Sequence, residues 1–202
     1  MPTQTQRERL IELLESSPVL KASAIVSHGI DRKTIQRMVQ TGEIQRIGRG
    51  LYSLSDYEVD SYHSYVEAQL LVESGVVCLL SALSFHEIGT QTPRYVWLAV
   101  CRPSRIPKAE GLPVKIVTFS DPAFSAGIEE HQIEGVRVKV YSPAKTVADC
   151  FKYRNKLGID VAIEALREAV REKNVSPDEV LRFADICRVR SVVVPYLESV
   201  VQ

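Results

Sequence analysis

The most constraining feature of this 202-residue sequence is a short stretch that gathers positive charge and then runs into a tight turn. No acid lies between Asp31 and Glu43, and Gly48-Arg-Gly50 then separates two alternating segments. Residues 17–55 hold six basic and two acidic residues, a net charge of +4, whereas the whole chain is neutral, so the remainder carries −4. This asymmetry predicts a small basic N-terminal unit followed by a larger, mildly acidic one.

Three helices are predicted at the amino end from the spacing of apolar residues, over residues 5–15, 21–28 and 32–40. We expect Asp31 to cap the third helix by accepting a hydrogen bond from a backbone N–H in its first turn. One face of the third helix should point inward through three apolar residues: Ile35, Met38 and Val39.

A hairpin follows these helices. Residues 43–47 and 51–54 alternate as strands, and the glycines between them permit a tight turn. Three helices followed by two strands is the element order of a winged helix-turn-helix. The sequence therefore predicts a winged helix-turn-helix DNA-binding domain over residues 1–56, with a second domain over residues 57–202.

The outward face of the third helix carries only basic and amide side chains. Arginine can bind guanine and glutamine can bind adenine through two hydrogen bonds, so this face is suited to the major groove of double-stranded DNA. The residues expected to contact base edges and nearby phosphates are Lys33, Gln36, Arg37 and Gln40. Those expected to contact phosphates alone are Arg32, Arg46 and Arg49. The alternative is a basic surface that is merely solvated.

The second domain is predicted to be α+β, a small sheet with helices towards the carboxyl end. Residues 95–100 and 114–119 favour strands, and Glu134-Gly135 joins two further strands as a hairpin. Ser142 and Pro143 form a helix start, after which helical patterns dominate.

Catalytic chemistry finds little support in this sequence. The four cysteines lie far apart and form no CxxC pair, so no metal and no cofactor are expected. We considered a metal-dependent nuclease set and judged a solvated surface the better interpretation: Asp121, Glu129, Glu130 and Lys139. His86 is expected to be a hydrogen-bonded, partly buried histidine.

Two further expectations concern partners and location. A basic stripe could extend a nucleic-acid footprint or be a solvated loop: Arg102, Arg105, Lys108 and Lys115. No apolar run approaches the ~18 residues that a membrane-spanning helix needs, and the charged amino end is unlike a secretory signal. We therefore expect a cytoplasmic protein without a membrane partner.

Three blocks of sequence resemble the AbiEi family of antitoxins from type IV toxin–antitoxin systems and phage-defence operons. They are the wing and its flank at 42–54, a helical block at 80–89, and Ser142-Pro-Ala-Lys-Thr-Val-Ala-Asp-Cys-Phe151. Within the last block, Thr146 and Asp149 match a Thr-x-x-Asp helix start of the family. From the residues alone, we expect Thr146 to bond back to its own helix and Asp149 to meet Arg154 or Lys152.

The resemblance implies a two-domain transcriptional repressor that binds inverted repeats upstream of its own operon. It implies that the second domain counters a nucleotidyltransferase-like AbiEii toxin, with or without stable contact. The protein would then be no enzyme, and a monomer in solution or a dimer on DNA. An enzyme directed to nucleic acid by the winged helix, and a ligand-sensing regulator, remain alternatives.

Overall fold

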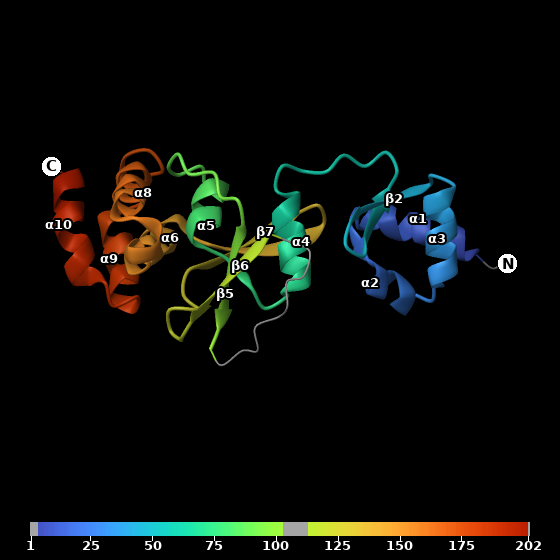
Figure 1. Ribbon diagram of the computed structural model, residues 1–202, viewed down its shortest axis with the longest axis horizontal. Coiled ribbons are helices and arrows are strands. Elements are labelled where there is room, and N and C mark those ends of the chain that lie inside the picture. The colour runs from blue at the N-terminus through green and yellow to red at the C-terminus, as the bar shows by residue number, and fades with distance from the viewer. Residues whose placement is uncertain (1–3, 103–112, 202) are drawn as a thin grey trace. The chain divides into compact units, whose positions relative to one another are not determined.

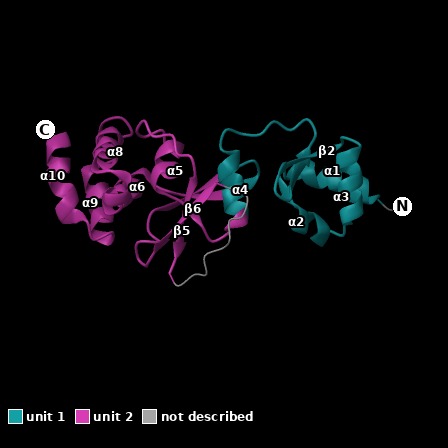
Figure 2. Ribbon diagram, in the orientation of Figure 1, with its two compact units in different colours: residues 1–70, 132–137 teal, residues 71–131, 138–202 magenta. Residues whose placement is uncertain are grey.

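The structure is a computed structural model that describes residues 4–102 and 113–201 (Figure 1). It contains helices and two sheets, which confirms the α+β class. The chain divides into two compact units, residues 1–70 with 132–137, and residues 71–131 with 138–202 (Figure 2). Among the described residues, no helix is both long and apolar enough to cross a membrane.

The first unit begins with three helices and a three-stranded antiparallel sheet in the order β1-β3-β2. Its elements are α1 (Gln6–Ser16), β1 (Leu20–Lys21), α2 (Ala22–Ser27), α3 (Arg32–Gln40), β2 (Ile44–Gly48) and β3 (Leu51–Leu54). Both expected strands and all three expected helices are present, in the order of a winged helix-turn-helix. Strand β1 was not predicted, because two residues are too few to show an alternating pattern.

The apolar stripes of the three helices meet in one core with β2. Its buried residues are Leu10, Leu14, Ile25, Ile30, Ile35, Met38 and Ile44. Helix α1 begins with a capping box, in which the Thr5 hydroxyl accepts from the Glu8 N–H and the Glu8 carboxylate accepts from the Thr5 N–H. Hydrogen bonding of the Glu8 carboxylate to Thr5, first to its backbone N–H and then to its side chain, lowers the pKa of Glu8.

The first unit extends past residue 56, the boundary expected from sequence. Glu134, in the turn between β7 (Ile128–Ile133) and β8 (Val136–Tyr141), accepts hydrogen bonds from the Asp60 N–H at 2.8 Å and from His63 Nδ1 at 2.6 Å. The other nitrogen of His63, at the start of α4 (His63–Leu71), lies 3.3 Å from the Ile47 carbonyl on β2. The buried carboxylate of Glu134, 74 residues after Asp60 in the sequence, thus connects α4 to the hairpin turn within this unit.

The second unit is built on a five-stranded sheet in the order β6-β5-β4-β8-β7. Strand β5 is an inner strand, parallel to β6 and antiparallel to β4. The strands and the helix inserted between them are β4 (Val76–Val77), α5 (Leu79–Phe85), β5 (Val96–Cys101), β6 (Val114–Phe119), β7 and β8. Glu134 and Gly135 both have positive φ, 53° and 74°, the geometry of a two-residue hairpin turn, so the predicted hairpin is confirmed.

Five helices follow the sheet in sequence, and Figure 1 shows four of them, α6, α8, α9 and α10, gathered together. Their bounds are α6 (Pro143–Lys152), α7 (Arg154–Leu157), α8 (Ile159–Arg171), α9 (Pro177–Ile186) and α10 (Arg190–Val201). Helix α6 is buried over Ala144 to Phe151, and both α8 and α9 pack on it. Ser142 caps α6 through its hydroxyl, as expected.

Because α6 is buried, its polar side chains pair with other groups inside the unit. Lys145 is fully buried, with Nζ 2.5 Å from Asp149 Oδ2 one turn along the helix. The same ammonium lies 4.0 Å from the ring centre of Tyr141 and 4.8 Å from that of Phe119. The other oxygen of Asp149 accepts a hydrogen bond from the Cys187 thiol at 3.3 Å.

Two expectations about the Thr-x-x-Asp motif were therefore wrong. Asp149 forms its ion pair with Lys145 rather than with Arg154 or Lys152, because its side chain points into the core, where a charge needs a buried partner. Thr146 donates to the Tyr141 carbonyl at 3.2 Å, which precedes the helix, and so it ties α6 to the end of β8. Burial raises the pKa of Asp149 even though Lys145 opposes that shift.

We predict that Lys145→Met lowers the free energy of unfolding of the second unit by about 3–5 kcal/mol, because it leaves the Asp149 carboxylate buried without its cation. Trp97, the sole tryptophan, is buried on β5, so its fluorescence during urea unfolding reports on this unit alone. The double variant Lys145→Met with Asp149→Leu should recover most of the loss. Exposed Lys156→Met is the control and should change stability by less than about 0.5 kcal/mol. Equal effects of the two single lysine variants would contradict the role of the buried pair.

A second prediction concerns His86, which is partly buried and lies 2.8 Å from the Tyr141 carbonyl through Nε2, as expected for a satisfied histidine. Burial lowers its pKa, so the unfolded chain takes up a proton near pH 6.5 while the folded unit resists it. Stability linked to His86 is thus complete above pH 6.5 and is lost as the pH falls below that value.

His86→Gln keeps an N–H donor for the carbonyl but cannot titrate. Between pH 7 and 5, its unfolding free energy, followed by Trp97 fluorescence, should fall less steeply than that of the unchanged protein. His28→Gln, at an exposed position directly after α2 in the first unit, is the control. Parallel curves for the unchanged protein and His86→Gln would contradict the prediction.

Candidate nucleic-acid interface

The amino end of α3 is held in place by one side chain of α1. Gln6 accepts hydrogen bonds through Oε1 from the Asp31 N–H at 3.0 Å and from the Thr34 hydroxyl at 2.9 Å, and donates through Nε2 to the Asp31 carboxylate at 3.1 Å. Asp31 occupies the N-cap position as predicted, but its side chain makes no capping bond, because Gln6 engages it instead. The two helices are thereby fixed to each other by three polar contacts.

The buried face of α3 consists of Thr34, Ile35 and Met38. Val39 was expected to lie in the core, and that expectation was wrong, because its side chain is 36% exposed. Thr34 takes its place, since its hydroxyl bonds to Gln6 and can be buried without loss. The helix is therefore rotated about its axis relative to the predicted orientation, with Thr34 buried in place of Val39.

This rotation leaves a continuous exposed face without an acid. All seven residues predicted to contact DNA are exposed: Arg32, Lys33, Gln36, Arg37, Gln40, Arg46 and Arg49. Five of them lie on α3, and the exposed Val39 stands beside Gln36 and Gln40 on the same face. An apolar side chain among amides is chemically suited to the methyl group of thymine, and the sequence pattern did not assign Val39 to this face. The spacing of three residues between Gln36 and Val39 is the signal that could have revealed it.

The remaining two cations lie on the hairpin of β2 and β3. Arg46 donates through Nε to the Gly48 carbonyl at 3.0 Å, which keeps its guanidinium beside the turn. Arg49 lies in the turn itself, next to Gly50 at φ 73°. The register of the two strands shifts between Arg46 and Gly48, so the hairpin carries a bulge at this point.

Glu43 is the acid that follows α3, and its charge is compensated. Its carboxylate accepts hydrogen bonds from the Thr41 hydroxyl at 2.8 Å and from the Arg7 guanidinium. These two hydrogen bonds lower the pKa of Glu43, so it remains ionised. The pairing with Arg7 prevents this acid from cancelling the positive charge of α3.

The residues considered for a nuclease lie on β7, on β8 and after β6 in the second unit. Among the residues that the structure describes, no three of His, Cys, Asp and Glu are arranged to hold a metal ion. Asp121 follows β6 and lies 3.6 Å from the Cys101 thiol, whereas Glu129 and Glu130 lie on β7 and Lys139 on β8. All four cysteines are free.

The basic stripe considered for nucleic acid is described only in part, because Arg105 and Lys108 lie outside the described residues. Lys115 Nζ lies 4.1 Å from the ring centre of Trp97, and Arg102 donates through Nε to the Thr118 hydroxyl at 3.0 Å. Both partners, Trp97 on β5 and Thr118 on β6, belong to the five-stranded sheet.

Helix-turn-helix order, a solvent-facing basic helix and an adjoining basic hairpin are the features of a transcriptional-regulator domain. Residues 8–55 match the model of a family described as "Transcriptional regulator, AbiEi antitoxin". The match over residues 8–55 is consistent with the resemblance seen in the sequence. No curated protein matches the chain.

The fold is shared with a solved structure. The crystal structure of the RV2827C protein from Mycobacterium tuberculosis superimposes with a TM-score of 0.60, over 98% of this chain and 82% of that one. The two sequences are 12% identical, so the likeness establishes the fold alone.

Proposed function

We propose that this protein is a DNA-binding transcriptional repressor that autoregulates its operon as the antitoxin of a type IV toxin–antitoxin system. The observation that carries the proposal is the acid-free face of α3, where six exposed side chains stand together: Arg32, Lys33, Gln36, Arg37, Val39 and Gln40. The family match over residues 8–55 supports a regulatory role. The protein acts by binding rather than by catalysis.

The roles proposed for the residues of α3 and of the hairpin follow from the chemistry of their side chains. Gln36 and Gln40 present paired donors and acceptors to adenine, and Arg37 can bind guanine through two hydrogen bonds. Arg46 and Arg49, on the hairpin, contact the phosphate backbone and fix the position of the domain on the duplex. A single α3 covers a short half-site, so specific repression uses two copies on an inverted repeat, as a dimer formed on DNA.

The toxin and the operon belong to the same proposal. The antitoxin counters an AbiEii-like nucleotidyltransferase encoded beside it, and the phage-defence role follows from that pairing. Co-expression of the two genes should restore growth that the neighbouring enzyme alone arrests. Failure to restore growth would contradict the antitoxin function while leaving DNA binding intact.

We predict a steep salt dependence of DNA binding. With about five phosphate contacts per copy, a plot of log Kd against log salt should have a slope of magnitude about 4–5 for each bound copy, because each contact releases condensed counterions. The measurement is fluorescence anisotropy with a labelled duplex that carries the inverted repeat upstream of the gene. A flat salt response would contradict the phosphate contacts.

Two substitutions should distinguish a residue that positions the domain on the DNA backbone from one that recognises the base sequence. Arg49→Ala should weaken binding to all sequences alike and reduce the salt slope by about one. Gln36→Ala should cost about 1–3 kcal/mol on the operator and relax the preference at one base position. Arg167→Ala, an exposed arginine on α8, is the matched control and should change neither quantity. A position-specific loss in Arg49→Ala, or a uniform loss in Gln36→Ala, would reverse these assignments.

A further inference from the structure

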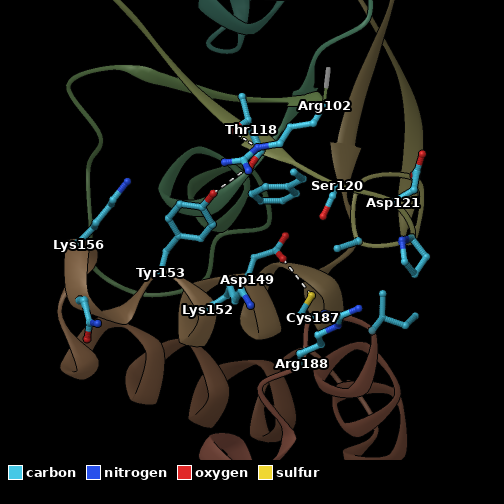
Figure 3. Close-up of a pocket in the computed structure, with 15 residues that line it drawn as sticks. Arg102, Thr118, Ser120, Asp121, Asp149, Lys152, Tyr153, Lys156, Cys187 and Arg188 are labelled. Carbon is cyan, nitrogen blue, oxygen red and sulfur yellow. Dashed lines mark hydrogen bonds between the residues drawn. The ribbon is translucent and has the colours of Figure 1, made fainter. Parts of the chain in front are cut away.

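The second unit contains a pocket of about 470 Å³ that DNA binding does not use. It lies where the end of β6 meets the carboxyl ends of α6 and α9 and the short helix α7. Figure 3 shows Arg102 and Thr118 on one side of this pocket and Asp149, Cys187 and Arg188 on the opposite side. Pockets of this size hold small organic ligands, which are larger than a phosphate ion.

Four cations line the pocket: Arg102, Lys152, Lys156 and Arg188. Within residues 4–102 and 113–201, none of them forms an ion pair, and Arg102 alone donates to a neutral partner in the pocket wall, Thr118. The chain outside residues 17–55 carries a net charge of −4, so this gathering of positive charge runs against the surrounding composition. Lys156 Nζ lies 5.5 Å from the ring centre of Tyr153. Cations without an acidic partner around a concave site favour an anionic ligand.

The acids of the pocket do not cancel this charge. Asp149, at its floor, is neutralised from below by Lys145 and is fixed by the Cys187 thiol. Asp121, on the rim, accepts a hydrogen bond from Cys101 at 3.6 Å. Four cations against one uncompensated acid leave an excess of positive charge that suits a dianion better than a single carboxylate.

Neutral polar groups complete the wall. The Thr118 hydroxyl, the Ser120 hydroxyl and the Asn155 amide line the pocket, and the Tyr153 hydroxyl lies 3.5 Å from the Thr118 carbonyl. Burial raises the pKa of Tyr153 to about 12, so the phenol stays protonated and can donate. Hydroxyl and amide groups are suitable partners for the hydroxyls of a sugar.

Arg188 follows α9 in a left-handed conformation that four other non-glycine residues described in the structure also adopt. Arg188 has φ 57°, and its N–H bonds to the Asp185 carbonyl while the Val189 N–H bonds to the Ala184 carbonyl. This is the position after a helix where glycine is favoured, because a side chain strains the left-handed backbone. From this position Arg188 lines the pocket.

We propose that the pocket binds a small phosphorylated sugar, including the sugar phosphate of a mononucleotide. The guanidinium groups of Arg102 and Arg188 and the ammonium of Lys152 hold the phosphate, to which arginine is suited through paired hydrogen bonds. The hydroxyls and amide of the wall take the sugar. The inference stands apart from DNA binding, because its residues lie in the second unit and those of the interface in the first.

Isothermal titration of the full chain with ribose 5-phosphate and with AMP tests the proposal. Both should bind, whereas ribose and adenosine, which lack the phosphate, should not, and inorganic phosphate should bind more weakly than either. Arg188→Gly should weaken binding about tenfold or more, through loss of a charged hydrogen bond, while the melting temperature stays the same or rises. Lys152→Ala should weaken binding similarly.

Two controls locate the site. Arg167→Ala should leave binding unchanged, and so should Arg37→Ala on α3, which impairs only DNA binding. The proposal is overturned if neither phosphorylated probe binds at millimolar concentration, if Arg188→Gly binds them as the unchanged chain does, or if Arg37→Ala abolishes binding. Binding of inorganic phosphate as tight as that of ribose 5-phosphate would overturn the sugar component. Binding of a 5′-phosphorylated oligonucleotide without either small probe would overturn the small ligand in favour of a nucleic-acid end.

Discussion

The buried cation of Lys145 organises the second unit. A charge removed from water costs several kcal/mol unless it is paired, so the elements around it must supply partners. Asp149 supplies the counter-charge, while Tyr141 on β8 and Phe119 on β6 present ring faces. At Gly127 a side chain would come within 2.7 Å of the lysine Cβ, so the chain can pass here only as glycine. One ammonium group thus fixes where two strands and helix α6 lie.

The same pair connects the core to the surface. Asp149 faces Lys145 on one side and lines the pocket on the other, where the Cys187 thiol from the end of α9 bonds to it. Because Lys145 compensates Asp149 from within, the cations on the rim of the pocket are left without a counter-charge from its floor. The Lys145–Asp149 pair therefore has two consequences: it stabilises the core, and it leaves the pocket positively charged.

Polar contacts play a corresponding role in the first unit. The apolar core holds the three helices together, but it does not by itself fix the rotation of α3 about its axis. The hydrogen bonds of Gln6 to Asp31 and Thr34 do so, and they bury Thr34 while Val39 is exposed. The pairing of Glu43 with Arg7 then keeps the exposed face positive. The exposed basic face of α3 thus depends on Gln6 and Glu43, neither of which lies on that face.

Local patterns in the sequence determined much of this protein. Apolar spacing, glycine turns and helix caps sufficed for the three N-terminal helices, the wing, the Glu134-Gly135 hairpin and the start of α6, because each depends on residues that are close in sequence. The excess of basic residues between 17 and 55 was likewise sufficient to indicate a cationic surface. Only the tertiary structure decided the partner of Asp149, the exposure of Val39, the inclusion of α4 in the first unit and the gathering of cations around the pocket. Each of these depends on side chains brought together from distant segments, or on which side of a helix is covered, and chain spacing alone carries no information about either.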